Sequence, residues 1–190
     1  AVKSIDPADP ILARDAERAA EDKLLEAGHT LLDACKKRKF DDALKVLDGL
    51  PLSQGAQDER EVVAAAAGFW DAFLKGYRAR VGQDTSLRLS DEKRATGKLG
   101  RVELDRAVVG LVEVEHDSLH ADQMILLAFD VLPAGEPASY VKTAMYFFVV
   151  GKRDVSRLYL ATARELGANI EGNERVWRTG AIRAAQVIKK

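Results

Sequence analysis

The sequence predicts a mainly α fold of the α+β class, in which helical hairpins of α-solenoid-like type carry a small antiparallel β-meander at about residues 83–120. Three observations predict it. Apolar residues recur at helical spacing along most of the chain, the period changes to two in the insert, and two distant segments share a helical-hairpin outline. The 190 residues are 47% hydrophobic, which suits a single domain over 1–190 with N-terminal helices at 10–82 and C-terminal helices at 121–190.

The N-terminal part predicts three amphipathic helices. The first begins at Pro10, a residue favoured in the first turn of a helix. Its apolar stripe contains Leu24, Leu25, Gly28, Leu31, Leu32 and Cys35. Gly28 inside this stripe predicts the close approach of a neighbouring helix. A second stripe covers 40–50, and the longest and clearest helical pattern covers 58–81.

The insert shows the alternation of apolar and polar residues that is typical of strands. Short alternating runs lie at 85–89, 101–105 and 112–115. Turns or bulges are expected at Gly97, Gly100 and Gly110. A meander of this size is marginal alone, so we expect it to pack on the helix at 58–81 or to curl into a small barrel.

Helical periodicity returns after the insert. We expect helices at 122–132, 139–150 and 154–166, separated by Pro133 and Gly151. A last helix is expected from about residue 173 to the end of the chain.

Charge and cysteine content exclude several classes of function. The 29 basic and 30 acidic residues nearly cancel, so we expect no nucleic-acid partner. No apolar run approaches the roughly 20 residues that cross a bilayer, so we expect no membrane-spanning segment. Cys35 is expected to be a small buried hydrophobe. The location stays open between the cytoplasm and export after removal of a signal peptide.

The two hairpin segments align without gaps. Arg38-Lys39-Phe40-Asp41 aligns with Gly151-Lys152-Arg153-Asp154, Ala43 with Ser156, and Leu47 with Leu160. In the second helix of the first hairpin, the bulky Phe40 and the small Ala43 are spaced as partners. With this spacing the hairpin at 24–50 resembles one tetratricopeptide repeat, and 139–167 resembles a degenerate second copy. The family's Trp-Leu-Gly-Tyr pattern is missing from the first helix. The resemblance implies an α-solenoid-like scaffold that binds a peptide or protein. The order of elements also resembles uncharacterised bacterial helical modules.

A polar cluster between the insert and the next helix contains the candidate metal ligands His116, His120 and Asp122. Two histidines four residues apart share one face of a helix, and a nearby carboxylate could complete a divalent metal site. The interval lacks the glutamate that serves as general base in such helical motifs. We interpret the cluster as a strand edge followed by a capped helix, with a metal site as the alternative.

Basic and aromatic residues predict a candidate interaction surface. Its candidate residues are Tyr77, Arg78, Lys152, Arg153, Trp177 and Arg178. Such residues could bind an acidic peptide or a polyanion by charge and stacking. Compensation of helix dipoles is the alternative, because most of them lie near predicted helix ends.

These patterns favour a non-catalytic protein- or peptide-interaction module that uses no cofactor and has a protein or peptide partner. The alternative is a metal-dependent, hydrolase-like enzyme that uses His116 and His120. The sequence leaves the oligomeric state open.

Overall fold

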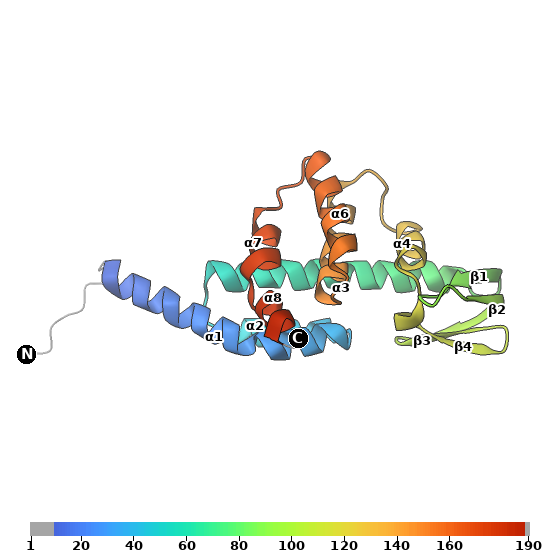
Figure 1. The fold of residues 1–190 in the computed structure, drawn as a ribbon, viewed down its shortest axis with the longest axis horizontal. Coiled ribbons are helices and arrows are strands. Elements are labelled where there is room, and N and C mark those ends of the chain that lie inside the picture. The colour runs from blue at the N-terminus through green and yellow to red at the C-terminus, as the bar shows by residue number, and fades with distance from the viewer. Residues whose placement is uncertain (1–9, 189–190) are drawn as a thin grey trace, which may run out of the picture.

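The computed structural model describes residues 10–188 and confirms a mainly α fold with a small antiparallel sheet (Figure 1). The helices are α1 (Pro10–Lys36), α2 (Phe40–Asp48), α3 (Gln54–Ala79), α4 (Ala121–Phe129), α5 (Pro137–Val149), α6 (Arg153–Glu165), α7 (Glu171–Thr179) and α8 (Ala181–Ile188). The strands are β1 (Asp84–Arg88), β2 (Arg94–Val102), β3 (Arg106–Val109) and β4 (Val112–Glu115), followed by the 3-10 helix η1 (His116–Ser118).

Helix α3 extends along the molecule and carries the sheet at its C-terminal end (Figure 1). It begins one turn before the predicted 58–81 because the side chain of Ser53 accepts a hydrogen bond from the Ala56 N–H (3.1 Å). Its apolar stripe, which includes Phe69 and Phe73, is fully buried. The other elements pack around this stripe.

The sheet is an antiparallel meander in the order β1-β2-β3-β4, as predicted. The register between β2 and β3 shifts between Leu99 and Val102. Gly97 and Gly100 lie inside β2, so no turn forms there, and the register shift around Gly100 corresponds to the bulge that was the other expectation. Gly97 has φ +143°, and a Cβ at this position would lie 3.0 Å from the Cα of Gly110. A glycine is therefore needed for this close approach of two backbones.

The apolar face of the sheet joins the core of the helical part. Leu87, Leu99 and Leu119 are fully buried, and they belong to the same hydrophobic cluster as the buried side chains of α3 and α4. The meander therefore packs on the end of α3, which was one of the two arrangements expected from its size.

Both predicted hairpins form, as α1 with α2 and as α5 with α6. Helix α3 lies between them and packs against both α2 and α5. The contacts between the two hairpins therefore run mainly through α3. An α-solenoid-like stack stays a prediction.

The predicted last helix is two helices, because Gly180 has extended backbone angles and separates α7 from α8. Helix α8 packs on α1 at Gly28, where an added Cβ would lie 2.6 Å from the carbonyl oxygen of Ala181. The close approach predicted at Gly28 is thus confirmed. The buried side chain of Glu59, in α3, accepts a hydrogen bond from the Ile182 N–H (3.2 Å). This bond satisfies one of the free N–H donors at the start of α8.

The two longest helices are amphipathic. Helix α1 has 27 residues and α3 has 26. Cys35 lies on the buried side of α1 and is fully buried, as predicted.

Between residues 10 and 188, no helix combines the length and the apolar character that crossing a membrane requires.

Candidate functional site

The turn between α1 and α2 contains a left-handed residue. Arg38 has φ +57°. Its N–H donates to the carbonyl of Cys35 (3.1 Å), and the N–H of Lys39 donates to the carbonyl of Ala34 (2.9 Å). These two bonds form a Schellman motif, in which glycine is the usual left-handed residue because it has no Cβ. A residue other than glycine is uncommon in this conformation.

The turn between α5 and α6 has the same geometry. Gly151 has φ +86° and donates to the carbonyl of Phe148 (3.0 Å), and Lys152 donates to the carbonyl of Phe147 (2.8 Å). Lys152 has φ −87° and ψ 70°, and Lys39 has φ −89° and ψ 59°. The two segments that align in the sequence therefore share one backbone conformation at their turns.

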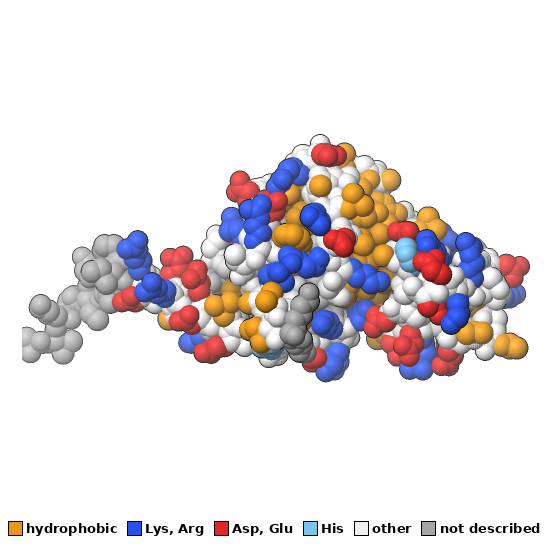
Figure 2. Space-filling model, viewed as in Figure 1, with side chains coloured by type: hydrophobic (Ala, Val, Ile, Leu, Met, Phe, Trp, Pro, Cys, Tyr) orange, Lys and Arg blue, Asp and Glu red, His pale blue; other side chains and the backbone are white. Residues whose placement is uncertain are grey.

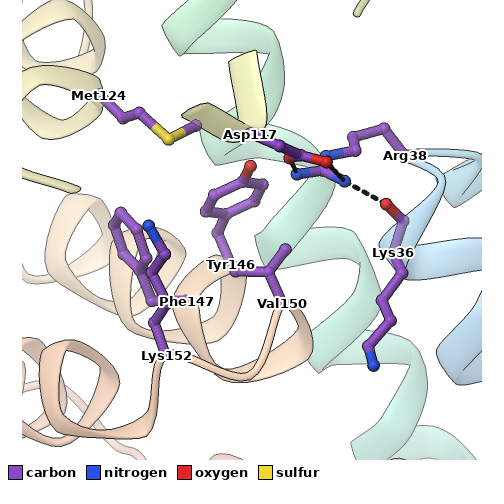
Figure 3. A pocket seen from close by; sticks show the side chains of 8 residues that line it. All are labelled: Lys36, Arg38, Asp117, Met124, Tyr146, Phe147, Val150 and Lys152. Carbon is purple, nitrogen blue, oxygen red and sulfur yellow. Dashed lines mark hydrogen bonds and ion pairs between the residues drawn. The ribbon is translucent and has the colours of Figure 1, made fainter. Parts of the chain in front are cut away.

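The two turns border a single pocket of about 270 Å³, which we call the Arg38 pocket (Figure 3). It is lined by Lys36, Arg38, Asp117, Met124, Tyr146, Phe147, Val150 and Lys152. Three of these side chains are cationic and one is a carboxylate, while α4, α5 and the turn after α5 supply an apolar floor. The pocket thus combines positive charge with a floor of apolar side chains that are mostly buried.

Arg38 joins three segments of the chain at this pocket. Its guanidinium carbon lies 5.4 Å from the ring centroid of Trp70 in α3. The guanidinium also forms an ion pair with Asp117 in η1 and donates to the carbonyl of Lys36 (Figure 3). The side chain of Arg38 is only 18% exposed, whereas that of Asp117 is 65% exposed. The Arg38 side chain is therefore held in place, and its charge is matched by Asp117.

Tyr146 forms the buried wall of the pocket. Its ring stacks on Phe69 (4.6 Å between centroids) and on Trp70 (5.8 Å). Burial raises the pKa of Tyr146 to about 12, against the opposing effect of the Arg38 charge. The hydroxyl is directed toward Arg38 and Asp117 (Figure 3). It therefore remains a neutral hydrogen-bonding group at neutral pH.

His116, a predicted metal candidate, lies in an aromatic cage. It is fully buried against Trp70, Phe73 and Tyr77, with ring centroids 5.6, 5.2 and 5.6 Å away. Its Nε2 lies 3.1 Å from the carbonyl oxygen of Glu103. Burial lowers the pKa of His116, so the ring is neutral and donates this hydrogen bond from Nε2. The role of His116 is to fix η1 and the sheet against α3.

His120 and Asp122 lie at the start of α4. The Nδ1 atom of His120 accepts a hydrogen bond from the Asp122 N–H (3.3 Å), so His120 caps the helix. Because His116 faces the core, the three predicted ligands do not converge. Within the part of the chain that the structure describes, no group of three or more His, Cys, Asp or Glu side chains could hold a metal ion together. The alternative hypothesis of a metal-dependent enzyme therefore finds no set of metal ligands among the described residues.

Three of the predicted interaction residues come together where α6 meets α7, namely Arg153, Trp177 and Arg178. The guanidinium carbon of Arg153 lies 4.2 Å from the ring centroid of Trp177, and Nη2 donates to the Trp177 carbonyl (3.3 Å). Burial lowers the pKa of Arg153, and the charges of Arg183 and Arg157 lower it further. Figure 2 shows Lys and Arg side chains gathered over α6 and α7. We call this surface the α6–α7 basic face and define it by Arg153, Arg157, Trp177 and Arg178.

The other predicted interaction residues lie elsewhere. Lys152 precedes α6 and lines the Arg38 pocket. Arg78 lies near the C-terminal end of α3, where it donates to the carbonyl of Val102 (3.5 Å). Tyr77 is fully buried, so its predicted place on an interaction surface is wrong. The physical reason is that Tyr77 lies on the face of α3 that is covered by His116 and the sheet.

Sequence reasoning missed the Arg38 pocket. Arg38, Asp117 and Tyr146 belong to segments that are far apart in the chain, and no spacing in the sequence links them. One signal was present, because Arg38 aligns with Gly151 at a position where a helix ends. An arginine where the second copy has glycine predicts a left-handed residue whose side chain compensates for the backbone.

The chain was also compared with known proteins. No family model matches it, and comparison with curated proteins and with solved structures finds no significant match. Function must therefore be inferred from the Arg38 pocket and the α6–α7 basic face themselves.

Proposed function

We propose that this chain is a non-catalytic interaction module that binds an acidic peptide segment of a partner protein on the α6–α7 basic face. The observation that carries this proposal is the stacked pair of Arg153 and Trp177, 4.2 Å apart. Two further arginines, Arg157 and Arg183, act on the Arg153 charge. Like charges held close together repel one another, and a bound carboxylate would relieve that repulsion.

The acidic side chains of the face itself leave positive charge in excess. Arg157 pairs with Asp154 (3.1 Å), and Arg164 pairs with Glu174. Arg178 and Arg183 form no ion pair with the carboxylates of residues 10–188. The face is therefore locally positive in a chain whose net charge is only −1, and this favours an anionic partner.

The face also contains a hollow of about 230 Å³ between α6 and α7. Its apolar wall is formed by Leu160, Ala161, Ile170 and Trp177, and its rim by Arg157, Arg164, Glu174 and Arg178. An apolar side chain of a peptide would fill the hollow while neighbouring acidic side chains reach the arginines. Buried aromatic residues and arginines are the residue types that contribute most to protein interfaces.

The proposal predicts selective, salt-sensitive binding of acidic peptides. The test is an array of short peptides rich in Asp and Glu, with basic and neutral arrays for comparison, followed by fluorescence anisotropy with the best peptide. We expect Arg178→Glu and Arg157→Glu each to weaken binding about tenfold, because each reverses a charge at the rim. Arg14→Glu, an exposed residue of α1, is the matched control and should keep the affinity.

Two results would contradict this proposal. One is equal affinity of the acidic peptide for the wild type and for both reversed-charge variants. The other is an affinity for a single-stranded oligonucleotide of the same charge that equals the affinity for the peptide, since that would indicate a general polyanion site.

A further inference from the structure

We propose that two copies of this chain associate through the N-terminal half of α1, which pairs antiparallel with the same segment of the second copy. The surface involved is the α1 charged face, which we define by Arg14, Glu17, Arg18 and Glu21. The proposal goes beyond peptide binding and does not rest on it, because the α6–α7 basic face belongs to other helices.

The N-terminal half of α1 projects beyond the other helices (Figure 1). From Ala13 to Glu26, every residue is exposed except Ala20 and Leu24. Helices in proteins draw most of their stability from packing against other elements rather than from intrinsic propensity. This part of α1 has little such packing within its own chain, so a partner helix would stabilise it.

The charges of this face are unfavourable in a single copy. Arg14 and Arg18 are four residues apart, and so are Glu17 and Glu21, and like charges at this spacing destabilise a helix. Each arginine also has a glutamate three residues further on, but none of the four side chains forms an ion pair within residues 10–188. The face therefore presents four unpaired charges to a partner.

The order of these charges is self-complementary. The pattern Arg-x-x-Glu-Arg-x-x-Glu gives Glu-x-x-Arg-Glu-x-x-Arg when it is read backwards. In an antiparallel pair centred between residues 17 and 18, Arg14 lies at the level of Glu21 of the second copy, and Arg18 at the level of Glu17. A parallel pair would place like charges opposite one another. The pattern thus fits a two-fold symmetric dimer, in which the same surface of both copies meets.

An apolar hollow lies on the same side of α1. It has a volume of about 360 Å³ and is lined by Glu21, Leu24 and Leu25 together with residues of α3, α7 and α8. Leu25 is 49% exposed. In the antiparallel pair, the first turn of the second copy's α1, which begins at Pro10 and is apolar in sequence, lies at the level of Leu25. The charges therefore set direction and register, while two symmetric apolar contacts contribute affinity.

The first experiment measures self-association of the whole chain by sedimentation equilibrium. The contact involves one helix from each copy, which is typical of weak complexes, so concentrations up to about 500 µM are used. We expect a monomer–dimer equilibrium that weakens when the salt concentration is raised from about 50 to 500 mM, because the ion pairs are exposed. A chain that stays monomeric over this whole range would overturn the proposal.

A charge exchange tests which surface is used. The double variants Glu17→Arg/Glu21→Arg and Arg14→Glu/Arg18→Glu should each weaken self-association at least about tenfold, because each places like charges opposite one another. An equimolar mixture of the two should associate again, because opposite charges then face one another. Lys23→Glu is the matched control, since Lys23 is exposed and lies about 180° around α1 from Arg14. Unchanged dimerisation of both double variants would contradict the use of this face.

Spin labels test the antiparallel direction. The variants Ala19→Cys and Glu26→Cys carry labels at exposed positions, seven residues apart on one side of α1. With a rise of 1.5 Å per residue, the two labels of a dimer should be offset along the axis by about 5 Å at residue 19 and about 25 Å at residue 26. Equal distances at the two positions would indicate a parallel pair and overturn the proposal.

Discussion

Arg38 shows how a single side chain compensates for an unfavourable backbone conformation. A left-handed residue other than glycine costs about 1–2 kcal/mol. The guanidinium offsets this through its contact with Trp70 and its ion pair with Asp117. Because these partners lie in α3 and η1, the same contacts fix the turn relative to the sheet.

Arg38→Gln is expected to lower the free energy of unfolding by about 1–2 kcal/mol, because glutamine keeps the backbone cost and loses the cation. Arg38→Gly should lose less, since glycine removes the cost of the left-handed conformation. Lys39→Gln, at the exposed next residue, is the control. Urea unfolding measures all three, and equal values for Arg38→Gln and Lys39→Gln would show that the Arg38 contacts contribute nothing to stability.

Glu59 is a fully buried carboxyl group between α3 and the start of α8. Burial raises its pKa to about 7, although hydrogen bonds from the backbone of Ala181 and Ile182 oppose the shift. The pKa in the folded state is thus above the ordinary value of 4.5. The protonated group therefore stabilises the fold fully at a pH below its ordinary pKa of 4.5, and this contribution is lost as the pH rises through 7.

Glu59→Gln should therefore flatten the dependence of stability on pH. Relative to this variant, we expect the wild type to lose about 3 kcal/mol of unfolding free energy as the pH rises from about 4.5 to 8. Urea unfolding at a series of pH values measures the difference. Parallel curves for the two proteins would mean that Glu59 titrates with an ordinary pKa.

Among the elements, α8 depends on a close backbone contact. It packs on α1 where Gly28 meets the carbonyl of Ala181. No side chain fits between the two helices at this point, so the position of α8 is set by the absence of a Cβ as well as by its buried residues Ile182 and Ala185.

Gly28→Ala should lower the free energy of unfolding by about 2 kcal/mol, because the new Cβ would overlap a backbone oxygen that cannot move away easily. Limited proteolysis should then release α8 earlier than in the wild type. Gly49→Ala is the matched control, since its Cβ would meet its nearest neighbour at 3.6 Å and its φ is −82°. Equal effects of the two substitutions would contradict the packing of α8 on α1.

The sequence predicts elements well where one amphipathic stripe decides them. The stripes at 40–50 and 58–81 correspond to α2 and α3 to within a few residues. The break at Gly180 was missed because the apolar stripe continues across it, and only the carboxylate of Glu59, from a distant helix, supports the new helix start. Gly97 was interpreted as a possible turn or bulge, since the need for a close approach to Gly110 is a tertiary property.

At the scale of the whole molecule, α3 connects the elements that form the two candidate surfaces. The Arg38 pocket combines the turns of both hairpins with η1, and the α6–α7 basic face lies where α6 of the second hairpin meets α7. Arg153, Trp177 and Arg178 could be grouped from sequence because they belong to successive helices. Arg38 and Asp117 could not, because only the packing around α3 brings them together.

The burial of Cys35 inside α1 has a practical consequence for work in solution. Burial raises the pKa of its thiol to about 12, so at neutral pH the sulfur is protonated and shielded from alkylating reagents. A second cysteine placed on an exposed helix can then be coupled to a dye or spin probe while the natural one is left in place. A pair of cysteines, one on α6 and one on the sheet, would in the same way give a spectroscopic ruler between these elements with Cys35 unchanged.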